Sequence, residues 1–95
     1  MRIEVPDKPK SWFVYILRCR DNSLYTGITT NLCQRLNEHN HSVKGAKYTR
    51  GRRPVSLVYF EKQLSRSDAA AREYAIKRLK KKEKELLIRT APSGI

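Results

Sequence analysis

The sequence predicts a small α/β domain in which helices flank a short three-stranded antiparallel sheet, in the order ββαβα(α). Two apolar runs near the N-terminus are joined by turn-forming residues, which indicates a hairpin. A third alternating run follows in the middle of the chain, and helical periodicity dominates the last third. A chain of 95 residues has room for one such domain with a modest core.

The first two strands are predicted at residues 12–19 (WFVYILRC) and 24–29 (LYTGIT), with the turn RDNS between them. The length of the turn decides the register. A two-residue loop at 21–22 would pair Tyr15 with Ile28 and place Tyr15 and Tyr25 on opposite faces. A loop at 21–23 would pair Tyr15 with Thr29 and bring both tyrosines to one face. The sequence leaves both registers open.

The first helix is predicted to begin near Thr30 or Asn31, because Asn31 and Gln34 have the spacing of a capping box. It is expected to fade at residues 39–45, and the basic stretch that follows has room for one helical turn.

A third strand is predicted at 55–61 and a helical region at 65–89, capped by Ser65 or Ser67, with a break near Lys81. Residues 12–89 therefore form the predicted domain, between a flexible leader (1–11) and a tail (90–95).

Charge is the strongest feature of the composition, with a formal net charge of +12. Residues 44–53 carry five cations and no acid, and residues 77–84 carry six cations and one acid. Such clusters indicate a polyanionic partner, which predicts nucleic acid; the alternative is a solvated surface that keeps the protein soluble.

Several classes of protein are disfavoured. No apolar run approaches the ~20 residues of a membrane span, and the first ten residues lack an apolar signal core, so we expect a cytoplasmic protein without a membrane partner. Cys19 and Cys33 are predicted to be reduced core residues. A zinc site combining them with His39 and His41 fits no common ligand spacing.

Three further features allow chemistry, each with a simpler alternative. Tyr15 and Tyr25 are a candidate pair or ordinary strand aromatics. Arg35 and His39, spaced i and i+4, project from one helix face as a phosphate-binding pair or a basic surface pair.

Glu73 is placed at the edge of the apolar stripe of its helix, where a carboxylate needs a cation. It is predicted to pair with Arg72, Lys77 or Arg35, or to bind a divalent metal.

The order of these residues resembles the GIY-YIG nuclease family. VYI (14–16) and YTG (25–27) stand where the two tripeptides of the family name belong, Arg35 follows Gly27 by eight residues, and His39 and Glu73 lie on the expected helices. The resemblance spans residues 12–88 and is strongest to the small single-domain bacterial YhbQ-like (UPF0213-type) proteins.

The resemblance implies a divalent-metal-dependent endonuclease that hydrolyses phosphodiester bonds in DNA. It would be structure-specific or weakly specific, act in DNA repair or processing, and need no small-molecule cofactor. Glu73 would bind one Mg²⁺ or Mn²⁺, Tyr15 or Tyr25 would act as base or nucleophile, Arg35 would stabilise phosphate charge, and His39 would relay a proton.

The other function left open is a nucleic-acid-binding protein that uses the scaffold with little or no turnover, on DNA or RNA. In either case the residues predicted to contact nucleic acid are Gly27, Lys44, Lys47, Tyr48, Arg50, Arg52, Arg53 and Lys77.

Overall fold

The computed structural model of the protein describes residues 11–91. The predicted leader and tail therefore lie almost entirely outside the described residues. Among the residues described, no helix is long and apolar enough to cross a membrane.

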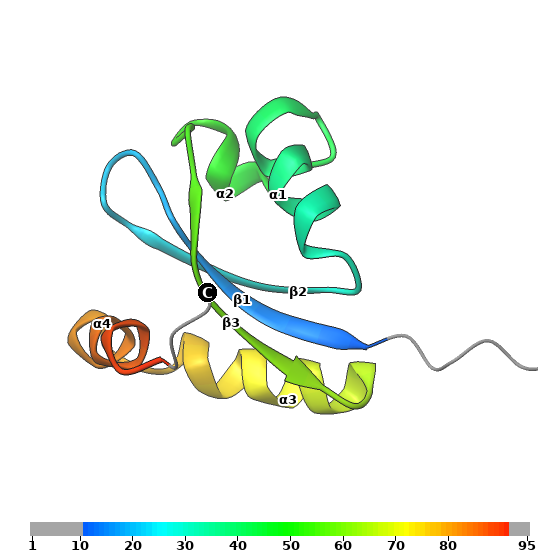
Figure 1. The fold of residues 1–95 in the computed structure, drawn as a ribbon. Coiled ribbons are helices and arrows are strands. Elements are labelled where there is room, and N and C mark those ends of the chain that lie inside the picture. The colour runs from blue at the N-terminus through cyan, green and yellow to red at the C-terminus, as the bar shows by residue number, and fades with distance from the viewer. Residues whose placement is uncertain (1–10, 92–95) are drawn as a thin grey trace, which may run out of the picture.

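The sheet has three antiparallel strands in the order β2-β1-β3, which confirms the predicted fold class. β1 (Trp12–Arg18) is central, and β2 (Leu24–Thr29) and β3 (Ser56–Gln63) pair with its two edges. β3 runs two residues past its predicted end because Gln63 pairs with Trp12 at the start of β1. Helices α1 and α2 lie on one face of the sheet, and α3 and α4 lie on the other (Figure 1).

The β1–β2 hairpin closes differently from both predicted registers. The amide of Cys19 donates to the carbonyl of Ser23 at 2.8 Å, so the loop consists of residues 20–22. Asn22 adopts a left-handed conformation with φ of 69°, as three-residue hairpin loops require at their last position. Tyr15 consequently pairs with Gly27, and the predicted partners Ile28 and Thr29 are wrong. The predicted length of three residues was one of the two alternatives, but the loop begins one residue earlier.

α1 begins at its predicted cap, and α2 is one short helical turn. α1 (Leu32–His41) begins after Asn31, whose Oδ1 accepts from the Gln34 amide at 3.0 Å. Only half of the predicted capping box forms, because the Gln34 side chain turns toward Glu38 instead. α2 (Lys47–Arg50) is the single turn expected in the basic segment.

The C-terminal helical region divides into α3 (Arg66–Lys77) and α4 (Lys81–Arg89). The Ser65 hydroxyl caps α3 by accepting from the Asp68 amide at 3.0 Å, as predicted. The interruption lies at residues 78–80, directly before the predicted break.

Each face of the sheet has its own core. On the α3 side, the buried residues are Val14, Ile16, Tyr59, Ala69 and Ile76. On the α1 side, they are Tyr15, Leu17, Cys19 and Val55. Alternate residues of β1 contribute to the two cores, as expected for a central strand with two covered faces.

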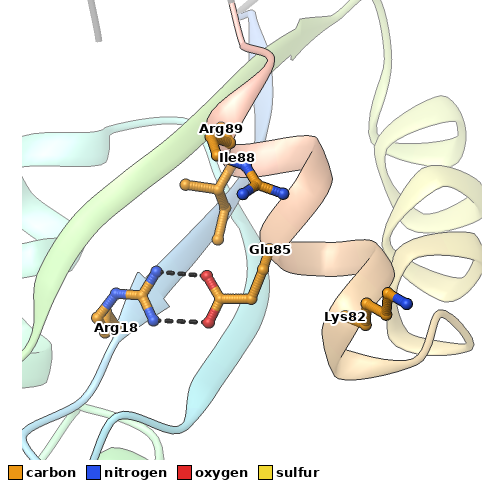
Figure 2. A pocket seen from close by; sticks show the side chains of 5 residues that line it. All are labelled: Arg18, Lys82, Glu85, Ile88 and Arg89. Atoms are coloured by element: carbon orange, nitrogen blue, oxygen red, sulfur yellow. Dashed lines mark hydrogen bonds and ion pairs between the residues drawn. The ribbon is translucent and has the colours of Figure 1, made fainter.

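α4 is tied to the sheet by a two-pronged ion pair. The Arg18 guanidinium donates to the two carboxylate oxygens of Glu85 at 2.8 and 2.6 Å, beside Ile88 and Arg89 in a hollow of about 440 Å³ (Figure 2). The Lys81 ammonium also donates to the Asn22 carbonyl at 2.7 Å, so α4 contacts the hairpin loop as well as β1. This anchoring lies on the face of the sheet opposite α1.

Candidate active site

A buried chain of hydrogen bonds joins β1 to α1 and α2. The hydroxyl oxygen of Tyr15 lies 2.8 Å from Nε2 of His39, and Nδ1 of His39 lies 2.9 Å from the hydroxyl of Thr49. His39 and Thr49 are fully buried, and Tyr15 is 2% exposed. The structure therefore brings together two of the predicted catalytic residues and adds a third polar residue, Thr49.

Aromatic rings extend this chain toward the surface. The half-buried ring of Tyr25 lies 6.4 Å from that of Tyr15, 5.2 Å from His39 and 6.0 Å from Tyr48, centroid to centroid. The guanidinium of Arg52 lies 3.9 Å above the Tyr48 ring. Tyr15 pairs with Gly27 across the hairpin, and Tyr25 is two residues from Gly27 on the same strand. Because alternate residues of a strand share a face, Tyr15 and Tyr25 lie on the same face of the sheet.

Gly27 makes room for Tyr15. A Cβ added at residue 27 would lie 2.5 Å from the Tyr15 hydroxyl and 2.7 Å from Cζ, so any larger residue would push the phenol ring aside. The strand surface left bare by Gly27 is thus covered by the Tyr15 ring. Contact of this glycine with nucleic acid stays a prediction.

Arg35 lies beside Tyr15 and is held at one end. Its Nη1 donates to the Glu38 carboxylate at 2.9 Å and to the Lys44 carbonyl at 2.8 Å. The loop can approach α1 this closely because residue 45 is glycine: a Cβ there would lie 2.6 Å from the Glu38 carbonyl oxygen and 2.9 Å from the His39 Cα. About a quarter of the Arg35 side chain, 27%, stays exposed for an anion.

Burial sets the protonation states of the central pair. It raises the pKa of Tyr15 to about 12, with the nearby Arg35 guanidinium opposing the shift and Tyr25 and Glu73 adding to it. Burial, followed by the charges of Arg35 and Arg53, lowers the pKa of His39 to about 4. Both side chains are therefore neutral at pH 7.

Glu73 forms one of the ion pairs predicted for it. Its carboxylate lies 3.3 Å from the Lys77 ammonium, one turn along α3, and 23% of its side chain is exposed. The candidate partner Arg72 instead pairs with Glu61 on β3, at 2.7 Å. Although α3 packs on the other face of the sheet, Glu73 is close enough to raise the pKa of Tyr15.

The residues predicted to contact nucleic acid divide into exposed and inward-facing groups. The guanidinium of Arg53 turns inward and donates to three carbonyls at the end of α1, those of His39 (2.5 Å), Ser42 (2.6 Å) and Glu38 (3.3 Å). These contacts stabilise the end of α1, which falls within the range where the helix was predicted to fade, since the last carbonyls of a helix need donors. Arg53 is thus committed to the fold, whereas the exposed members of the set are Lys44, Lys47, Arg50 and Lys77.

Arg52 links the basic segment 44–53 to the hairpin loop. Arg52 Nε donates to Asp21 of the hairpin loop at 3.1 Å, and Nη1 donates to the Tyr48 carbonyl at 2.9 Å. About two-fifths of its side chain, 41%, is exposed, so a phosphate can still reach it.

The two cysteines predicted to lie in the core differ in their burial. Cys19 is buried as predicted, but Cys33 is exposed on α1, so its assignment to the core is wrong. Residues 11–91 hold no group of three or more His, Cys, Asp or Glu side chains that could bind a metal ion.

Sequence reasoning missed Thr49 entirely. Its neighbours in the sequence, Tyr48 and Arg50, attract attention as an aromatic and a cation, whereas a single threonine in a basic segment carries no signal of its own. Only the packing of α2 against α1 reveals that its hydroxyl faces His39.

Comparison with known proteins assigns this arrangement to a family. The protein-family model of the GIY-YIG catalytic domain matches residues 11–86 of this chain. A UPF0213 protein of Desulfotalea psychrophila is 56% identical over 88 residues, covering 93% of this chain and 79% of the relative. A UPF0213 protein of Clostridium perfringens is 55% identical over 76 residues, covering 80% and 81%.

Solved structures agree with the fold. The solution structure of the UPF0213 protein BH0048 from Bacillus halodurans is 43% identical with a TM-score of 0.56, covering 87% of each chain. The solution structure of the protein EF2693 from E. faecalis is 41% identical with a TM-score of 0.58, covering 90% of this chain and 94% of that one.

Proposed function

The chain belongs to the GIY-YIG nuclease family and, within it, to the UPF0213 proteins, and we propose on that ground that it is a divalent-metal-dependent endonuclease acting on DNA in the cytoplasm. The observation that carries the proposal is the buried contact of Tyr15 with His39, which gives a phenol a proton acceptor 2.8 Å away. DNA repair or processing is the role we propose for it.

The residues present fit one hard divalent cation. Mg²⁺ keeps several waters and is bound through one or two carboxylates together with substrate phosphates, and Glu73 offers one partly exposed carboxylate near Tyr15. The competing Lys77 is on the surface and one helical turn away, so its ammonium can move aside. When bound, Mg²⁺ or Mn²⁺ would supply positive charge that stabilises the leaving oxygen.

Tyr15 and His39 then relay the proton of the attacking water. As the attacking water loses its proton to the Tyr15 oxygen, the Tyr15 hydroxyl proton passes to His39 Nε2. A free phenolate never forms, so a Tyr15 pKa near 12 is no obstacle to the relay. Arg35, beside Tyr15, offers its guanidinium to the charge that develops on the phosphate.

The outer residues bind substrate. Tyr25 and Tyr48 present ring faces on which a base can stack, and Lys44, Lys47 and Arg50 are exposed for phosphate contacts. A domain of this size has few elements for reading bases, so we propose recognition of phosphate and shape, hence structure-specific or weakly specific cleavage.

Cleavage of supercoiled plasmid and branched DNA in Mg²⁺, Mn²⁺ or EDTA tests the proposal. We expect metal-dependent nicking that is lost in Tyr15→Phe and Glu73→Gln and kept in Tyr74→Phe and Asp68→Asn, which alter exposed residues of α3. Nicking that survives Glu73→Gln would refute the mechanism. Salt-sensitive binding without nicking under any condition would favour the nucleic-acid-binding protein without turnover.

A further inference from the structure

Thr49 lies at the inner end of the hydrogen-bonded chain and is within hydrogen-bonding distance of two groups. Its Oγ1 is 2.9 Å from His39 Nδ1 and 2.9 Å from the carbonyl oxygen of Ala46. A hydroxyl has one proton to donate and two lone pairs. The destination of that proton decides which nitrogen of His39 is protonated.

In the first arrangement, Thr49 donates to Nδ1. The ring proton is then on Nε2 and is donated to the Tyr15 oxygen. The hydroxyl proton of Tyr15 has no other acceptor among residues 11–91, and a buried donor without an acceptor is costly.

In the second arrangement, Thr49 donates to the Ala46 carbonyl, Nδ1–H donates to Thr49, and Tyr15 donates to Nε2. Every proton of the chain then has an acceptor. The Ala46 amide, 3.4 Å from Nδ1 at a partly buried position, has no acceptor there in this arrangement, but that contact is longer than the 2.9 Å bond to Thr49. The second arrangement leaves a long, partly buried amide contact unsatisfied where the first leaves the buried Tyr15 hydroxyl unsatisfied, so it is the less costly of the two. It also agrees with the neutral phenol and neutral imidazole that follow from the raised pKa of Tyr15 and the lowered pKa of His39.

We propose that Thr49 is a positioning residue that holds His39 as the Nδ1–H tautomer, so that the lone pair of Nε2 is aimed at the Tyr15 hydroxyl. The O–H bond of Tyr15 breaks and the Nε2–H bond forms in the relay, which leaves an imidazolium whose Nδ1–H is still bonded to Thr49. The consequence for catalysis rests on the proposed nuclease function, whereas the tautomer itself does not.

Nitrogen-15 NMR of the imidazoles in the full-length protein at pH 7 tests the tautomer directly. His41→Gln removes the other histidine and so assigns the signals. We expect a protonated Nδ1 and an unprotonated Nε2 at His39. The opposite pattern in the wild-type protein would overturn the inference, whether or not any variant folds.

Two substitutions then isolate the hydroxyl. Thr49→Val keeps the shape and removes the donor, and it should lose the Nδ1–H tautomer as the dominant form. DNA cleavage should fall roughly 10- to 100-fold, by analogy with the loss of hydrogen-bond partners that orient metal-ligating histidines. Thr49→Ser restores the hydroxyl and should restore both the tautomer and the cleavage.

The outcomes separate the two proposals. A Thr49→Ser variant that folds but recovers neither readout would overturn the role of the hydroxyl. A Thr49→Val variant with an unchanged tautomer would do the same. The expected tautomer in a wild-type protein that cleaves nothing would support the positioning by Thr49 and refute the nuclease proposal.

Discussion

Mild acid should destabilise this protein through the buried imidazole of His39. The pKa of His39 falls from 6.5 in the unfolded chain to about 4 in the fold, because burial and then Arg35 oppose its charge. Arg53 acts in the same direction, and Glu38 acts against it. Between pH 6.5 and pH 4 the His39 imidazole is protonated in the unfolded chain but not in the folded protein. The free energy of unfolding is therefore highest above pH 6.5 and decreases as the pH drops toward 4.

The magnitude follows from linkage. One pKa unit corresponds to 1.36 kcal/mol, so the loss is about 3 kcal/mol when complete, below pH 4. At pH 5 it is about 2 kcal/mol, a large share of the ~5–15 kcal/mol that holds a domain together. The carboxylates with lowered pKa, those of Asp21, Glu38 and Glu85, lose their contribution mainly at lower pH.

Urea unfolding at pH 7.5 and pH 5 measures the effect. The free energy of unfolding of the wild-type protein should fall by about 2 kcal/mol more than that of His39→Gln, which lacks the titrating ring. His41→Gln, which alters an exposed imidazole on the same helix, should behave as the wild type does. An equal pH dependence in wild type and His39→Gln would refute the reasoning.

Three substitutions test the packing around the site. Gly45→Ala should cost roughly 1–3 kcal/mol in urea unfolding, since its Cβ would lie 2.6 Å from a backbone oxygen, whereas Gly51→Ala, with nothing within 4 Å, should cost nothing; equal effects would contradict this. Arg53→Ala should destabilise by roughly 2 kcal/mol through the carbonyls it abandons, whereas Arg50→Ala should leave stability unchanged and weaken DNA binding, and the reverse pattern would refute these assignments. Gly27→Ala should displace the opposing phenol and abolish nicking while costing only about 1 kcal/mol in thermal unfolding, and full activity would show that this close fit is dispensable.

The parts of the fold that depend on local chemistry could be predicted from the sequence. The caps at Asn31 and Ser65 are recognisable because one side chain and one amide three residues later suffice to form them. The strands were also recognisable, since their apolar alternation reflects the two covered faces of the sheet. The register of the hairpin could not be predicted from the sequence. It depends on which residue of the turn adopts a positive φ, and that residue is Asn22.

The site was predictable as a set of residues but not as an arrangement. The tripeptides and the spacing of Arg35 and His39 indicated the members. Neither the inward turn of Arg53 nor the contact of Thr49 with His39 could be derived, because both depend on how α2 packs against α1. Long-range packing of this kind leaves no periodic signal in the chain.

The three-residue hairpin loop restricts which insertions and deletions relatives of this protein can tolerate at residues 20–22. Side chains alternate between the faces of β2, so an insertion or deletion of one residue at 20–22 would carry Tyr25 and Gly27 away from Tyr15 to the α3 side. A change of two residues would keep the tyrosines on one face, although Gly27 would no longer oppose Tyr15. Among relatives that keep this site, loop lengths should therefore share the same parity, and most should have the same length.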